Sequence, residues 1–127
     1  MTGHGIIQFD PPTRLLNLNG RQHWARRAAD VRVWRRAAWA AGVQAIHDGT
    51  ATRETGFSTV AITLPVKGNL RRDPHNFVPT LKAVVDGLVD AGVFADDSVK
   101  HLRTLEPVLD QAATVVTVII QPANETS

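Results

Sequence analysis

The sequence predicts an α+β fold in which a small mixed β-sheet of about four strands packs with two main helices. Three observations predict it. The spacing of apolar residues changes along the chain between the period of helices, three to four residues, and the period of strands, two residues. Glycine and proline residues separate these segments. The 127 residues contain no internal repeat and no linker, so we expect one domain over residues 1–127.

The first half of the chain predicts a strand, a long helix and a second strand. Gly5–Phe9 is typical of a short strand, which a pair of prolines ends. A basic loop, expected to be flexible, follows over 14–22. Apolar residues then recur every three or four positions from Trp24 onward, as in a helix over 24–48. Residues 57–66 alternate in the manner of a strand.

The second half predicts a shorter helix and two strands. The helix spans 79–91, because Pro79 suits a first helical turn and Gly92 suits a stop. Its apolar residues share one face, which we expect to be buried: Leu81, Val84, Val85 and Leu88. The strands, 102–109 and 114–121, are expected to form a hairpin.

Composition excludes several classes of function. There are no cysteines, which excludes disulfides, thiolate zinc sites and cysteine nucleophiles. No apolar run approaches the ~20 residues that span a bilayer, and 1–12 lacks the pattern of a secretory signal. No glycine-rich phosphate loop is present, so no nucleotide cofactor is expected. We therefore expect a cytoplasmic protein without a membrane partner.

Charge is divided unevenly along the chain. Residues 1–72 contain eleven Lys and Arg against four Asp and Glu, whereas 73–127 contain three against eight. A basic first half indicates a polyanionic partner. The arginines in and just before the long helix fit contacts to DNA phosphates, and its tryptophans fit either stacking or the core. An arginine-rich helix face in contact with water is the alternative.

The segment around Asp73 combines a carboxylate with an imidazole two residues later, at His75. In an extended segment these side chains point to the same side, so they are candidates to share a metal or a phosphate. The alternative is a polar turn in which Asn76 or Thr80 caps the following helix.

Acidic residues in and after the second helix extend this candidate site. Lys82, Asp86 and Asp90 lie four residues apart, opposite the apolar face. They form i,i+4 salt bridges, or they face a cleft together with Asp73. Asp97, in an acidic pair, offers the hard oxygen ligand that magnesium prefers. Asp97 reaches Asp73 only if the chain doubles back along the helix. Asp86 lies midway along that helix, so we expect it to be the third carboxylate.

These motifs resemble a known family. The string Arg71-Arg72-Asp73-Pro74-His75-Asn76, followed by Lys82, Asp86-Gly87-Leu88 and Asp96-Asp97-Ser98, is similar to the RusA family of Holliday-junction resolvases, which are common in phages and prophages. The likeness covers roughly residues 6–120 and is most specific over 71–98. It implies a homodimer, in the cytoplasm of a bacterial host, that uses magnesium to cut two opposed strands of a four-way DNA junction.

The resemblance also implies roles for single residues. Asp73 and Asp97 correspond to essential carboxylates of the family, and Lys82 corresponds to its catalytic lysine. Asn76 corresponds to the asparagine of the motif, and Asp86 to the acid on the helix. His75 stands where the best-known members have a second aspartate. The resemblance implies Mg²⁺ as the cofactor. Because a neutral imidazole suits manganese or zinc better than magnesium, we expect Mn²⁺ to be accepted or preferred.

The resulting hypothesis is a metal-dependent endonuclease that resolves four-way junctions. Its expected catalytic residues are Asp73, His75, Lys82 and Asp97, and its expected metal ligands are Asp73, His75, Asp86 and Asp97. Its expected DNA contacts are Arg14, Arg21, Arg26, Arg27, Arg71, Arg72 and Asn76. The alternatives are a junction-binding protein whose metal site has decayed at His75, and a domain that binds no nucleic acid.

Overall fold

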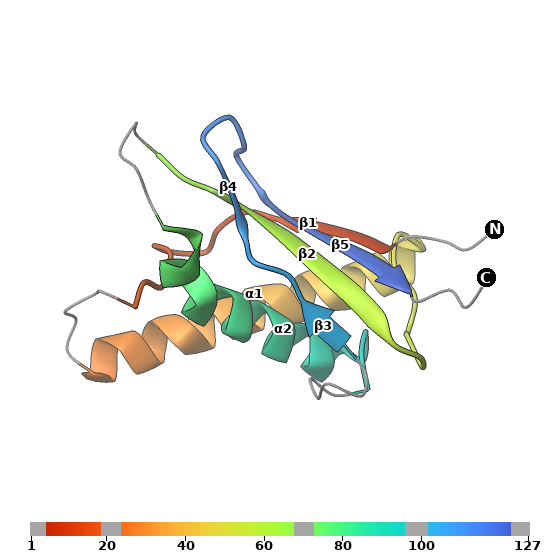
Figure 1. Cartoon of the computed structure of the whole chain (residues 1–127). Coiled ribbons are helices and arrows are strands. Elements are labelled where there is room, and N and C mark those ends of the chain that lie inside the picture. The colour runs from red at the N-terminus through yellow and green to blue at the C-terminus, as the bar shows by residue number, and fades with distance from the viewer. Residues whose placement is uncertain (1–4, 19–23, 68–72, 96–101, 123–127) are drawn as a thin grey trace.

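The computed structural model has the expected α+β architecture, with both helices on one face of a mixed sheet (Figure 1). It describes residues 5–18, 24–67, 73–95 and 102–122. Over these residues the elements follow in the order β1 (Gly5–Phe9), α1 (Trp24–Asp48), β2 (Ser58–Pro65), the 3₁₀ turn η1 (Pro74–Phe77), α2 (Val78–Ala91), β3 (Leu102–Thr104), β4 (Val108–Asp110) and β5 (Val116–Pro122).

The sheet has the order β1-β5-β2-β3, and β4 pairs with the same strand as β3, namely β2. β5 is antiparallel to both of its neighbours, whereas β3 and β4 are parallel to β2. The expected hairpin of 102–109 with 114–121 is therefore wrong, because β2 lies between these segments. The helical crossover through α2 brings β3 to one edge of β2 in the parallel sense, and β5 occupies the other edge.

The strand expected at 102–109 is interrupted. Val60 pairs with Thr104, but Thr63 pairs with Val108. The segment from β3 to β4, which we call the outer strand, therefore has one more residue over this stretch than β2 opposite it. An extra residue of this kind is a β-bulge, which bends a strand and redirects its side chains. Pro107, which has no backbone N–H, lies within the interruption.

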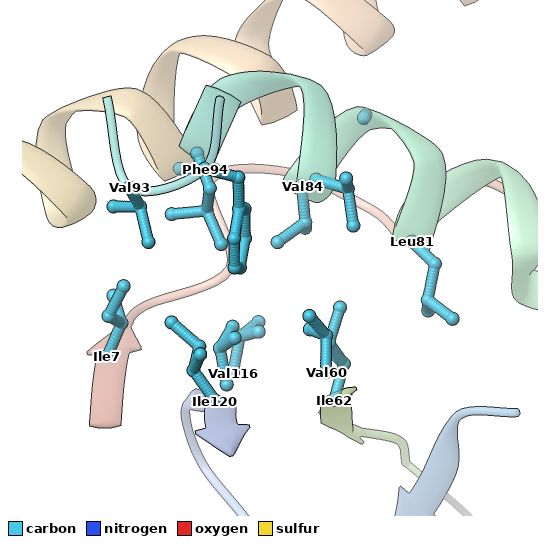
Figure 2. Close-up of a cluster of buried hydrophobic side chains, with 14 of the residues drawn as sticks. Ile7, Val60, Ile62, Leu81, Val84, Val93, Phe94, Val116 and Ile120 are labelled. Atoms are coloured by element: carbon cyan, nitrogen blue, oxygen red, sulfur yellow. The ribbon is translucent and has the colours of Figure 1, made fainter. Parts of the chain in front are cut away.

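The core lies between the sheet and the helices (Figure 2). Strand side chains on the inner face, among them Ile7, Val60, Val116 and Ile120, are at most 1% exposed. They point toward α2 and the segment after it. The apolar face of α2 is buried as expected from the spacing: Leu81, Val84, Val85 and Leu88. This burial fixes which side of α2 faces solvent.

Helix α1 is buried on only part of its length. Trp34 is 0% exposed and packs edge-on against Phe9, with ring centroids 6.2 Å apart. Trp24 is 76% exposed and Trp39 is 42% exposed. Of the two interpretations of the tryptophans, the core is correct for Trp34, whereas Trp24 lies on the first turns of α1, which extend past α2 (Figure 1).

Helix α2 ends at the expected Gly92, and a glycine, Gly49, also follows α1. Gly49 follows α1 with φ +83°, and Gly92 follows α2 with φ +89°. Side chains rarely tolerate this left-handed region, whereas glycine adopts it readily. Among the described residues, neither helix has the length and apolar composition of a membrane-spanning segment.

Candidate functional site

The segment after Asp73 is a turn and not an extended strand. Asp73 has φ −84° and ψ 117°, and its Oδ1 accepts a hydrogen bond of 3.0 Å from the backbone N–H of His75. Asp73 is thus the N-cap of η1. The expectation that Asp73 and His75 point the same way along an extended chain is wrong, since this cap turns the chain. The polar-turn alternative is correct, although the capping residue is Asp73 rather than Asn76 or Thr80.

His75 of η1 and Lys82 of α2 line the same cavity, of about 480 Å³, between α2 and the bulged edge of the sheet. We call it the Lys82 cavity. Its other walls are Val78, Leu81, Val85, Leu102, Thr104, Leu105, Glu106 and Pro107. Glu106 was missed from the sequence. Nothing in its local spacing marks it, because the bulge in the outer strand brings it to this place.

The charged residues of α2 form one ion pair within the helix and one with α1. Lys82 Nζ lies 3.0 Å from Asp86 Oδ1, the i,i+4 salt bridge that the spacing indicates. Asp90 instead receives two hydrogen bonds from Arg35 of α1, at 2.6 and 2.9 Å. The Arg35 hydrogen bonds hold the pKa of Asp90 below its ordinary value, and the same contact raises the pKa of Arg35. Asp86 also raises the pKa of Arg35 through its charge.

The expected metal ligands are only partly described. Within residues 5–18, 24–67, 73–95 and 102–122, no three His, Cys, Asp or Glu side chains lie close enough to hold an ion. One oxygen of Asp73 caps η1, and one oxygen of Asp86 accepts from Lys82. The described donors Asp73, His75 and Asp86 therefore do not fit a metal ion by themselves. Asp97, the fourth expected ligand, lies outside the described residues.

A second and larger cavity, of about 990 Å³, borders the same turn through Phe77. We call it the Arg14 groove. It is lined by Pro11, Thr13, Arg14, Leu15, Asn17, Pro65, Val66, Lys67, Phe77, Gln111, Ala113 and Thr114. Of these, only Arg14 was expected to contact DNA. Lys67 and Gln111 come from the end of β2 and the β4–β5 turn, and no sequence motif connects them.

The loop that carries Arg14 is fastened to the helices. The Trp34 indole N–H donates to the Arg14 carbonyl at 2.8 Å. Thr80 Oγ1 accepts from the Leu16 N–H and donates to the Leu16 carbonyl, both at 2.8 Å. The Leu18 N–H donates to the Asn76 carbonyl, also at 2.8 Å. Residues 14–18 form the expected loop, and hydrogen bonds from its donors and to its acceptors hold it to the rest of the fold.

The other expected DNA contacts lie in different surroundings. Arg26 is exposed on the first turns of α1, whereas Arg27 is half-buried and donates to the Asn17 carbonyl at 2.9 Å. Asn76 is half-buried, and its carbonyl holds Leu18. The remaining expected contacts lie outside the described residues: Arg21, Arg71 and Arg72.

No protein-family model and no curated protein sequence matches this chain. The likeness to the RusA family therefore stays a prediction, and the described geometry is the basis for the proposal that follows.

Proposed function

We propose that this chain is a divalent-metal-dependent endonuclease that cuts four-way DNA junctions, the activity that the RusA resemblance implies. The observation that supports it is the arrangement around η1. His75 lines the Lys82 cavity together with Lys82, and two residues later Phe77 lines the Arg14 groove. A site with a lysine, an imidazole and the Glu106 carboxylate thus adjoins a groove that contains two cations, and the Asp73 carboxylate lies at the start of the turn between them.

The residues of the chain have distinct tasks in this proposal. Lys82, which Asp86 holds in place at 3.0 Å, stabilises the negative charge that develops on the attacked phosphate. Arg14 contacts a flanking phosphate, which contributes affinity but little sequence information. Mg²⁺ or Mn²⁺, when bound, would supply charge neutralisation and activation of water. Its site needs Asp97 in addition to the described donors.

The proposal includes a homodimer in the cytoplasm of a bacterial cell. A four-way junction has two opposed strands to cut, and a two-fold dimer presents two identical sites to them. In this proposal the two-fold symmetry of the substrate is matched by the symmetry of the protein.

The test compares two substitutions of Asp73 on labelled four-way junctions, with Mg²⁺ and with Mn²⁺. Asparagine is as good an N-cap as aspartate, whereas alanine removes the cap at a cost of about 1 kcal/mol. Asp73→Asn should therefore lose cleavage but keep the stability of the fold, and Asp73→Ala should lose cleavage and about 1 kcal/mol of stability. Cleavage by Asp73→Asn at the rate of the unaltered chain would contradict the catalytic role of this carboxylate.

A second candidate function is junction binding without cleavage. It is favoured by His75 at the position of a family aspartate and by the engagement of Asp86 with Lys82. It predicts that the unaltered chain binds junctions but cuts none with any divalent ion. Absence of junction binding at physiological salt would contradict both candidates.

A further inference from the structure

The Arg14 groove is built from four segments that are distant in sequence. They are the loop after β1, the end of β2, Phe77 of η1, and the β4–β5 turn. Figure 1 shows these segments at one end of the molecule, opposite the start of β1 and the end of β5. At about 990 Å³ the groove is at the upper end of the ~300–1,000 Å³ range of ligand sites.

The chemistry of the lining is one-sided. Among the residues that the structure describes, the lining contains two cations, Arg14 and Lys67, and no acidic side chain. Asn17 and Gln111 add amide groups, and Thr13 and Thr114 add hydroxyls. The partly exposed apolar residues of the lining are Pro11, Leu15, Pro65 and Ala113, and the buried Val66 and Phe77 lie beneath them. Cations, amides and an apolar surface together match the phosphates, edges and faces of nucleotides.

Hydrogen bonds to the folded core hold the walls of the groove. Hydrogen bonds from Trp34 and with Thr80 hold the wall that carries Arg14, as described above. On the other side, Val66 N–H donates to the Asp110 carbonyl at 3.2 Å. Asp110 Oδ1 accepts from the Ala112 N–H at 2.8 Å, so its carboxylate shapes the β4–β5 turn. A preformed site loses little ordering entropy on binding.

We propose that the Arg14 groove binds a single-stranded segment of DNA, where strands part at a branch point. Arg14 and Lys67 contact the phosphates, and Gln111 contacts the edges of the bases. A duplex keeps its base faces stacked, so it cannot cover the apolar lining, whereas an unpaired strand can. The biological meaning of this site rests on the proposed function, but the binding itself does not.

The first measurement is the affinity of the full chain for a fluorescent oligothymidine of about ten nucleotides, a length within the range of single-strand sites. Each phosphate contact contributes about 0.7 to the slope of log affinity against log salt. Lys67→Ala should therefore lower the slope by about 0.7 and the affinity about fivefold at 0.1 M salt. Gln111→Ala should weaken binding without changing the slope.

The matched control is Arg103→Ala, which removes an equal charge from an exposed residue of β3 outside the groove. It should leave the slope and the affinity unchanged. An equal loss for Arg103→Ala and Lys67→Ala would overturn the proposal, because binding would then depend on net charge alone. Competition by polyglutamate as strong as that by oligothymidine would overturn it too.

The second measurement locates the strand. The chain has no cysteine, so Thr114→Cys introduces a single thiol in the groove, and Gln121→Cys introduces one near the far end of β5. A thiol-bearing oligonucleotide should cross-link to the first variant and not to the second. Equal cross-linking would overturn the placement.

The two proposals fail separately. A chain that binds oligothymidine through Lys67 but cuts no junction contradicts only the nuclease. A chain that cuts junctions, while Lys67→Ala and Gln111→Ala bind oligothymidine normally, contradicts only the groove.

Discussion

Replacing Gly87 with alanine should separate the two helices. A Cβ atom added at Gly87 would overlap the carbonyl oxygen of Arg35 and would lie 2.8 Å from Ala38 Cβ and 2.9 Å from the Trp39 backbone nitrogen. Two of these three contacts are backbone atoms of α1, so a side-chain rotation cannot relieve them. Helix α1 must move away from α2 as a whole.

The magnitude follows from two opposing terms. Overpacking of a tight interface costs about 3 kcal/mol when the neighbours cannot adjust. Alanine in place of glycine inside a helix returns about 1 kcal/mol. The net loss in the free energy of unfolding is therefore about 2 kcal/mol. For a domain of this size that corresponds to a decrease in Tm of about 8 °C.

Urea denaturation and calorimetry measure this loss, and Gly56→Ala is the matched control. No atom lies within 4 Å of a Cβ added at Gly56, so this variant should be unchanged or more stable, by up to about 1 kcal/mol. If Gly87→Ala were as stable as Gly56→Ala, the close contact of α1 with α2 would not exist as described. Gly87 lies in the string that resembles the RusA family, and helix packing supplies a physical reason for a glycine there.

Two further predictions concern single side-chain contacts. Because Arg35 lowers the folded-state pKa of Asp90, Asp90 stabilises the fold at neutral pH, and this stability is lost as pH falls through the lowered pKa. Both partners are more than a third exposed, so the difference between the unaltered chain and Asp90→Asn should stay below about 1 kcal/mol at pH 7 and vanish in acid; an unchanged difference at low pH would contradict the pairing. Thr80→Val leaves the buried N–H and carbonyl of Leu16 without their partner, which should cost about 1–3 kcal/mol in urea denaturation and speed hydrogen exchange of the Leu16 amide. Unchanged exchange would show that Thr80 does not fasten the loop.

The candidate site was only partly accessible from the sequence. The spacing indicated that Lys82 pairs with Asp86, and the structure contains this salt bridge. His75 and Lys82 line one cavity, but the catalytic role that the resemblance implies for them stays a prediction. The role of Asp73 as a cap was not separable from a metal role, because a carboxylate suits both. Glu106, Lys67 and Gln111 could not be found, since each reaches its cavity from a different segment.

The sequence by itself determined the helices, their ends and the buried face of α2. These are local properties, since the backbone geometry of a helix or strand imposes its period on the residues within it. It did not determine that Trp34 is in the core while Trp24 is in solvent, or that β2 separates β4 from β5. Only the tertiary structure decided these, because burial and strand order depend on which distant apolar surfaces cover one another, and many local patterns are compatible with each arrangement.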